Sequence, residues 1–171
     1  MLSSNIKQLE AKKMKIKPEI KSFIFSYLIT ALFAGIGTFA SVSDSGRVYE
    51  QMIKPDFAPP SWIFSVVWPI LYILMAAAYG IYLNKRSSET PLCSFLYISG
   101  LILTAVWPHI FFVNEEYKTA FFIIVALIAL GVLTFYCFIK ESKVSAFLYL
   151  PYILWIIFAG VLNYNIALLN P

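Results

Sequence analysis

The stretch "KPDFAPPSWIFSVVWPILY", residues 54–72, decides how the rest of the chain is interpreted. Its first seven residues contain three prolines, Pro55, Pro59 and Pro60. Because proline lacks a backbone N–H and blocks helix continuation, these residues predict a loop. The loop runs directly into an apolar segment that carries two indole rings, Trp62 and Trp68. A purely structural helix has little use for two tryptophans at its entrance, so their surroundings decide their role.

Charged side chains are few and are segregated along the chain. Of 171 residues, 60% are hydrophobic and 13% are charged, against about 25% charged in typical soluble domains. The charged residues fall only within 7–21, 44–56, 85–89, 115–118 and 140–143. Between them lie five apolar stretches, at about 22–42, 60–84, 91–113, 119–139 and 144–169. Each stretch is long enough to cross a bilayer core of about 30 Å as a helix.

These stretches predict an all-α integral membrane protein. In lipid the backbone has to satisfy its own hydrogen bonds, so long apolar stretches form helices. The connections between them are short, which makes neighbouring helices antiparallel. We therefore expect one domain, residues 22–171, built as a bundle of five transmembrane helices. A basic tail, residues 1–21, precedes it.

Lys and Arg are distributed unequally between the two sides of this bundle. Ten lie in the tail and in the loops that follow the second and fourth spans, whereas the other side holds three, Arg47, Lys54 and Lys118. The positive-inside rule then places the N-terminus in the cytosol. We expect a multi-pass protein of the bacterial cytoplasmic membrane, or of an organellar membrane if the source is eukaryotic. The lysine-rich tail either lies on anionic lipid or forms a solvated leader.

Several function classes are disfavoured by what the five stretches lack. They contain no Asp, Glu, Lys or Arg, which counts against an ion-driven transporter. No group of His, Cys and carboxylates has metal-site spacing, so we expect no metal. Basic residues do not gather with aromatics on one face, so we expect no nucleic-acid partner. Cys93 and Cys137 fall near cytosolic helix ends, where we expect free thiols and no disulfide.

Some aromatic and polar residues lie deeper than the interface, where tryptophan usually anchors a helix. At 1.5 Å per helical residue, Trp68 is roughly 12 Å deep, whereas Trp62 lies in the interfacial belt and is expected to be an anchor only. Trp107 and Asn163 are each roughly 9 Å deep on the same side. His109 is roughly 6 Å deep and either bonds a neighbouring backbone group or contacts a ligand.

The deep residues belong to three helical stripes with spacings of three or four residues, which place each set on one face. The stripes are Trp68, Tyr72, Ala76 and Gly80; Gly100, Thr104, Trp107 and Phe111; and Pro151, Trp155, Ala159 and Asn163. Each stripe alone is typical of helix packing. Together, indoles, small residues and sparse neutral polar groups predict an apolar, flat-walled cavity for a flat hydrophobic ligand.

Three stretches resemble the translocator protein family, also known as tryptophan-rich sensory proteins, TspO/MBR proteins or peripheral benzodiazepine receptors. "KPDFAPPSWIFSVVWPILYILMAAAYG" at 54–80 resembles its first loop and second helix. "WPHIFF" at 107–112 resembles its third helix, and "PYILWIIFAGVLNYNIALLN" at 151–170 resembles its fifth. The resemblance covers residues 22–171.

The resemblance implies a five-helix bundle, often a homodimer, that binds porphyrin or haem-type tetrapyrroles and needs no cofactor. Sterols and synthetic benzodiazepine-type compounds are further ligands of the family. It implies the ligand-binding residues Trp68, Tyr72, Trp107, His109, Trp155, Ala159 and Asn163, and a lid made of Lys54, Pro55, Phe57 and Pro60. For the dimer face, Gly35 and Gly100 are candidates because close helix approach needs small residues.

The chain departs from the family pattern at several positions. Val48 stands where a lid tryptophan is usual, Thr104 and Ala105 replace an Asn-Trp pair, and His109 replaces Pro or Gln. These changes make the expected aromatic cage thinner. No basic residue follows Tyr164 closely, so we do not expect specific cholesterol binding.

Three functions remain open on the sequence. The leading interpretation is a membrane receptor or carrier for porphyrin-like ligands, with a role in their transport, sensing or stress regulation. The alternatives are an enzyme that promotes light-dependent porphyrin breakdown and a structural subunit of a membrane complex. No residue pattern fixes a general acid or base, so we expect binding without catalysis.

Overall fold

The computed structural model describes the backbone of residues 2–39, 45–86 and 91–171, and side chains from residue 20 onward within these ranges. All regular elements of this part of the chain are helical. They are α1 (Leu2–Phe39), α2 (Ser45–Gln51), α3 (Trp62–Lys85), α4 (Leu92–Pro108), the π-helical turn η1 (His109–Val113), α5 (Tyr117–Glu141) and α6 (Lys143–Leu169).

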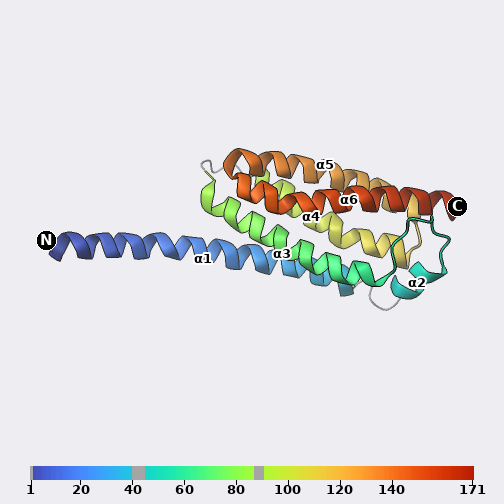
Figure 1. Cartoon of the computed structure of the whole chain (residues 1–171), viewed down its shortest axis with the longest axis horizontal. Coiled ribbons are helices and arrows are strands. Elements are labelled where there is room, and N and C mark those ends of the chain that lie inside the picture. The colour runs from blue at the N-terminus through green and yellow to red at the C-terminus, as the bar shows by residue number, and fades with distance from the viewer. Residues whose placement is uncertain (1, 40–44, 87–90) are drawn as a thin grey trace.

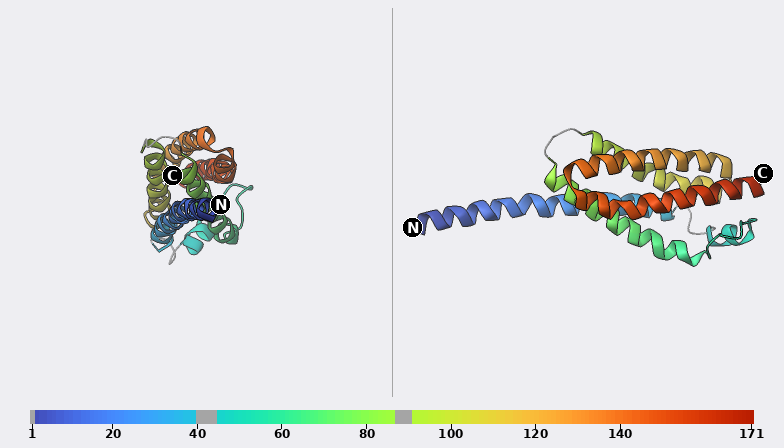
Figure 2. Two further views of the ribbon diagram at one scale, coloured as in Figure 1. Left: turned by 90° about the vertical axis from the view of Figure 1, so that its left-hand side faces the viewer. Right: turned by 45° about the horizontal axis from the view of Figure 1, so that its top comes forward.

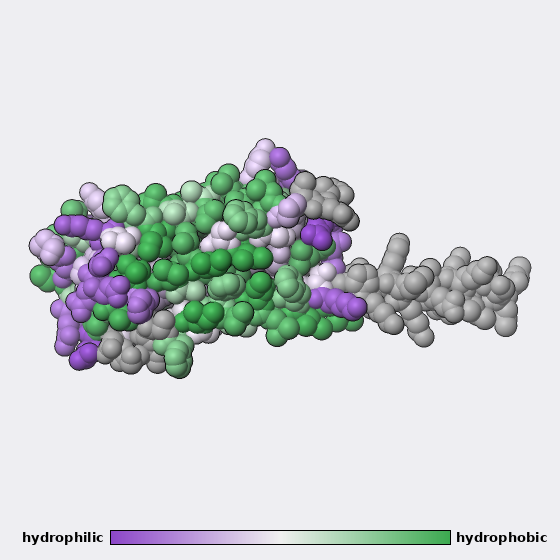
Figure 3. Space-filling view, turned by 180° about the vertical axis from the view of Figure 1, so that it is seen from behind, coloured by the Kyte–Doolittle hydropathy of each residue, from purple (hydrophilic) through white to green (hydrophobic). Residues whose placement is uncertain are grey.

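Five of these elements are long and apolar enough to cross a membrane: Ile20–Phe39, Trp62–Lys85, Leu92–Val113, Tyr117–Glu141 and Lys143–Leu169. These helices coincide with the five apolar stretches of the sequence to within a few residues, except that residues 40–42 of the first stretch lie outside the described residues. The sides of the bundle are apolar, and hydrophilic side chains gather toward its ends (Figure 3). Leu28, Phe122 and Phe147 are among the large apolar side chains exposed on its sides.

The helices pack as a closed ring. Helix α1 packs against α3 and α4, α3 packs against α6, α6 against α5, and α5 against α4. The helices are aligned, and α2 lies at the end of the bundle near the C-terminus (Figure 1). We call this the α2 end. The opposite end, where α3 and α5 finish at Lys85 and Glu141, is the basic end.

A rigid aromatic core fills the half of the bundle nearer the basic end. Tyr79 stacks on Tyr97 with ring centroids 4.2 Å apart, and Tyr82 stacks on Phe138 at 5.1 Å. All four side chains are at most 1% exposed. Buried aromatic pairs in these arrangements add about 0.5–1.5 kcal/mol each beyond their burial. This half therefore anchors the bundle and leaves the α2 end as the place for a cavity.

Cys93 and Cys137 form a disulfide, so the expectation of free thiols is wrong. Cys93 lies in the first turn of α4 and Cys137 in the last turns of α5, and these helices are antiparallel neighbours. Their Cα atoms are 5.8 Å apart, a normal separation for a disulfide. The two residues are 44 positions apart in the sequence, so only the helix pairing reveals their proximity.

The N-terminal tail continues α1, which begins at Leu2 and projects from the basic end (Figure 1). The side chains of its lysines before Lys21 lie outside the described residues. Of the two candidate dimer glycines, Gly100 is buried within the bundle, whereas Gly35 is exposed on α1. Gly100 is therefore not exposed for contact with a second protomer, whereas Gly35 is.

Candidate functional site

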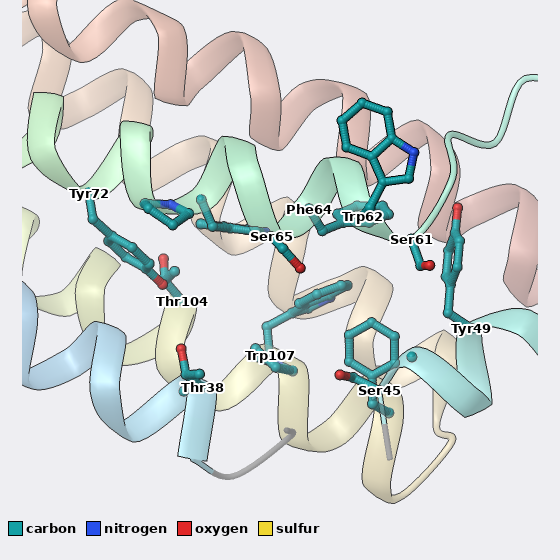
Figure 4. Close-up of a pocket in the computed structure, with 16 residues that line it drawn as sticks. Thr38, Ser45, Tyr49, Ser61, Trp62, Phe64, Ser65, Tyr72, Thr104 and Trp107 are labelled. Atoms are coloured by element: carbon teal, nitrogen blue, oxygen red, sulfur yellow. The ribbon is translucent and has the colours of Figure 1, made fainter. Parts of the chain in front are cut away.

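A cavity of about 480 Å³ lies at the α2 end, bordered by α1, α2, α3, α4 and η1. Its walls are mainly aromatic: Tyr49, Trp62, Phe64, Trp68, Tyr72, Trp107 and Phe112 line it (Figure 4). Its volume falls in the range of about 300–1,000 Å³ that small-molecule sites occupy. Rings from α2, α3, α4 and η1 thus border one largely apolar space.

The polar groups of this cavity are neutral. Hydroxyls of Thr38, Ser45, Ser61, Ser65 and Thr104 line it, and the described lining residues include no Asp, Glu, Lys, Arg or His. Thr104 Oγ1 donates to the Gly100 carbonyl at 2.8 Å and also pairs with the Tyr152 hydroxyl at 3.0 Å. The arrangement offers stacking, burial and a few hydrogen bonds, and the described lining supplies no charged group for a ligand.

Three predicted site residues, Trp68, Tyr72 and Trp107, line this cavity. Trp68 and Tyr72 are one helical turn apart on α3, with ring centroids 5.4 Å apart. Trp107, on α4, stacks on Phe111 at 4.8 Å. The stripe spacing on α3 and α4 thus placed these rings correctly on the inner face.

Asn163 holds Trp107 in place. Its Oδ1 accepts a hydrogen bond from Trp107 Nε1 at 3.1 Å, and its Nδ2 donates to the Tyr117 carbonyl at 2.9 Å. Asn163 is 1% exposed and lines a smaller space of about 20 Å³ behind Trp107, not the main cavity. Its amide is therefore engaged with protein groups, whereas the sequence suggested a polar ligand contact.

Trp155 and Ala159 lie one layer deeper than the main cavity. They line an inner space of about 20 Å³ together with Trp68 and Trp107. The Trp155 ring packs edge-on against Phe64, with centroids 5.7 Å apart. Both residues therefore back the cavity wall and do not border the main space.

His109 lies outside the cavity, whereas Trp62 borders it although the sequence predicted an anchor only. His109 is exposed at the start of η1 and lines none of the described cavities, whereas Phe112 of the same turn lines the main one. Single π-helical turns are frequent at functional sites. Trp62 is 63% exposed, as an interfacial anchor should be, but it also borders the cavity at its rim.

Two of the predicted lid residues, Lys54 and Pro55, form hydrogen bonds that fix the conformation of the loop. Lys54 Nζ donates to the carbonyls of Tyr49 at 2.6 Å and Glu50 at 3.1 Å, which closes the C-terminal end of α2. Pro55 begins a turn closed by the amide of Ala58. Phe57 is 49% exposed, and Pro60 is also exposed. None of the four is among the residues that line the cavity.

Helix α2 supplies the actual cover, through Ser45, Gly46 and Tyr49. Sequence reasoning missed this helix. Its signal was present, because the buried residues Val48, Tyr49 and Met52 follow helical spacing. Burial raises the pKa of the Tyr49 phenol, and its hydroxyl donates to the Pro59 carbonyl at 2.7 Å.

Residues 25–169 match the TspO/MBR family. The chain belongs to this family. It is 34% identical over 125 residues to the tryptophan-rich protein TspO of Chlorobaculum tepidum, which covers 72% of this chain and 79% of that protein. It is 30% identical over 151 residues to TspO of Archaeoglobus fulgidus, covering 88% and 98%. It is 30% identical over 143 residues to the translocator protein of Bos taurus, covering 81% and 83%.

Membership and the five apolar helices together make the chain a multi-pass membrane protein. The resemblance noted on the sequence is thereby confirmed. In this TspO/MBR protein the family-like stretches at 54–80 and 107–112 converge on the aromatic cavity, whereas the stretch at 151–170 mainly backs it.

Proposed function

We propose that the aromatic cavity binds a flat, hydrophobic tetrapyrrole of the porphyrin class and that the protein acts as a membrane receptor or carrier for it. The observation that carries the proposal is the set of three indoles, Trp62, Trp68 and Trp107, around one space of about 480 Å³. Aromatic faces favour a planar conjugated ligand because stacking adds about 0.5–1.5 kcal/mol per contact beyond area burial.

The polar groups fit the remaining parts of such a ligand. Hydroxyls of Ser45, Ser61 and Ser65 lie near the α2 end, where the carboxylate arms of a porphyrin could remain close to the membrane surface. The macrocycle would then lie deeper, between Trp68 and Trp107. We advance no catalytic role, because the described lining offers no carboxylate, imidazole or thiol to hold a proton.

We also propose a cytosolic N-terminus. Lys85, Arg86, Lys140 and Lys143 all lie at the basic end, on the same side as the projecting start of α1. The positive-inside rule would place this end in the cytosol. The cavity would then lie in the opposite leaflet, facing away from the cytosol.

The experiment is a porphyrin titration of the reconstituted protein, followed by the Soret shift and by quenching of tryptophan fluorescence. We expect saturable binding with a fixed stoichiometry. Trp68→Ala should weaken affinity by at least roughly tenfold, or about 1.4 kcal/mol. Phe147→Ala is the matched control, because Phe147 is 74% exposed on the outside of α6. Equal affinity of the Trp68→Ala and Phe147→Ala variants would contradict the proposed site.

A further inference from the structure

Helices α1 and α3 pack tightly in the half of the bundle nearer the basic end. Ser26 Oγ on α1 donates to the Ala76 carbonyl on α3 at 2.6 Å. One turn further along α3, a Cβ on Gly80 would lie 2.6 Å from the Phe23 ring. Only glycine therefore fits at position 80 without moving that ring. The two helices are locked together here.

Toward the α2 end, α1 follows α4. Thr30 Oγ1 and the Tyr97 hydroxyl are 2.7 Å apart, and a Cβ on Gly37 would lie 3.0 Å from the Ala105 Cα. The backbones of α1 and α4 thus approach closely up to the last turn of α1. Pro69 lies inside α3, where it removes a hydrogen bond and bends the helix. In the right-hand view of Figure 2, the N-terminal end of α3 leans away from α5 and α6.

Residues of both α1 and α3 line the cavity at this level, and we call the part of the cavity between the two helices the crevice. Thr38 on α1 and Ser65 and Pro69 on α3 all border the cavity, and all three are exposed. The crevice edges lie within the spans Ile20–Phe39 and Trp62–Lys85. The opening therefore lies at the outer edge of the membrane-spanning segments, in the last turn of the first span and the first two turns of the second.

By contrast, hydrogen bonds and a ring contact hold the loop at the α2 end in place. The Tyr49 hydroxyl donates to the Pro59 carbonyl at 2.7 Å, and the Tyr49 ring packs edge-on against Phe64 at 5.3 Å. Asn170, after α6, forms two hydrogen bonds with the backbone of Ile53, at 3.0 and 2.9 Å. A ligand entering through the loop would have to break these contacts.

We propose that the ligand enters and leaves the cavity sideways, from the bilayer, through the crevice between α1 and α3. This inference rests on the proposed function, and it defines the ligand as one already partitioned into the membrane. The edge of the crevice offers polar groups to an amphipathic ligand. The Ser65 carbonyl, four residues before Pro69, receives no helical hydrogen bond from that proline and remains an acceptor beside the Ser65 hydroxyl.

The test places a bulky group on the crevice after folding. Ser65→Cys is labelled with N-benzylmaleimide in the reconstituted protein, where Cys93 and Cys137 are already paired in a disulfide. Val66→Cys, labelled in the same way, is the matched control, because Val66 is 50% exposed on α3 but does not line the cavity. Stopped-flow fluorescence then follows a free-base dicarboxylic porphyrin transferring from phosphatidylcholine vesicles to the protein and back.

We expect label on Ser65→Cys to slow association and dissociation by a similar factor, about tenfold or more, within the range over which rates vary for one interface. Both rates are compared with those of the unlabelled Ser65→Cys variant, which already lacks the Ser65 hydroxyl. Relative to that variant, a blocked route slows both directions by a similar factor. A label that merely crowded the site would speed dissociation. The Val66→Cys label should change neither rate. The association rate should also follow the porphyrin-to-lipid ratio rather than the aqueous porphyrin concentration.

A second pair of substitutions tests the loop route. Ile53→Cys and Asn170→Cys, bridged by a bis-maleimide, hold the loop on α6, and we expect unchanged rates. If the bridge slows association while the Ser65→Cys label does not, the entry route is wrong although binding itself stands. If the unmodified protein binds no porphyrin, the proposed function fails first, and the inference fails with it.

Discussion

Asn163→Leu should destabilise the protein through Trp107 rather than remove a ligand contact. The substitution keeps a similar volume but deletes both hydrogen bonds of the amide, to Trp107 Nε1 at 3.1 Å and to the Tyr117 carbonyl at 2.9 Å. Interhelical hydrogen bonds in membranes average about 0.6 kcal/mol, with a maximum near 1.7. Two lost bonds therefore cost about 1.2–3.4 kcal/mol of unfolding free energy.

Porphyrin affinity should fall less than stability in this variant. Trp107 keeps its stacking on Phe111 but loses the bond that fixes the direction of its indole. We expect a loss of roughly threefold to tenfold in affinity, or about 0.6–1.4 kcal/mol. Trp107→Phe removes the same bond from the other side. The two substitutions should therefore be less than additive when combined, because they share one interaction.

The assay is denaturant unfolding in detergent micelles together with porphyrin titration of each folded variant. Asn165→Leu is the matched control, because Asn165 Nδ2 bonds only the Val161 carbonyl of its own helix, at 2.8 Å. An unchanged unfolding free energy for Asn163→Leu, combined with a complete loss of porphyrin binding, would refute this reasoning. Asn163 would then be a direct ligand contact.

Three further predictions concern topology, covalent structure and assembly. A reporter fused to the N-terminus should be cytosolic and one fused to the C-terminus should not, and a cytosolic C-terminus would mean that one span is misassigned. Alkylation and intact-mass measurement should find no reactive thiol until reductant is added, since Cys93 and Cys137 are paired; labelling without reductant would contradict the pairing. Gly35→Leu should weaken a dimer in detergent, because Gly35 is exposed. A Cβ at position 100 would meet open space, so Gly100→Ala should leave the dimer intact. A dimer that is weakened by Gly100→Ala but not by Gly35→Leu would place the interface elsewhere.

The bundle could be predicted from the sequence because the bilayer imposes length and composition on each span. The segregation of charge marked all five helices, and the period of three to four residues placed Trp68, Tyr72 and Trp107 on inner faces. Depth along the helix axis and helical spacing were enough to locate these rings.

Features that depend on how helices face each other were not predictable in this way. The disulfide needs the pairing of α4 with α5, and the true role of Asn163 needs the positions of Trp107 and Tyr117 on other helices. Depth along the helix also suggested that Trp62 lies outside the cavity. In the structure, Trp62 borders the cavity at its rim.

The most direct measurement uses the four tryptophans as internal probes. With ¹⁵N-labelled tryptophan, the protein gives four indole N–H signals, which single Trp→Phe variants assign. A bound porphyrin shifts the signals of rings that it stacks against, through its ring current. We predict the largest shifts for Trp68 and Trp107, a smaller one for Trp62 at the rim, and the smallest for Trp155, which lies behind the wall. Saturating porphyrin that leaves the Trp68 and Trp107 signals in place, or that shifts Trp155 more than either, would contradict the assignment of the cavity as the ligand site.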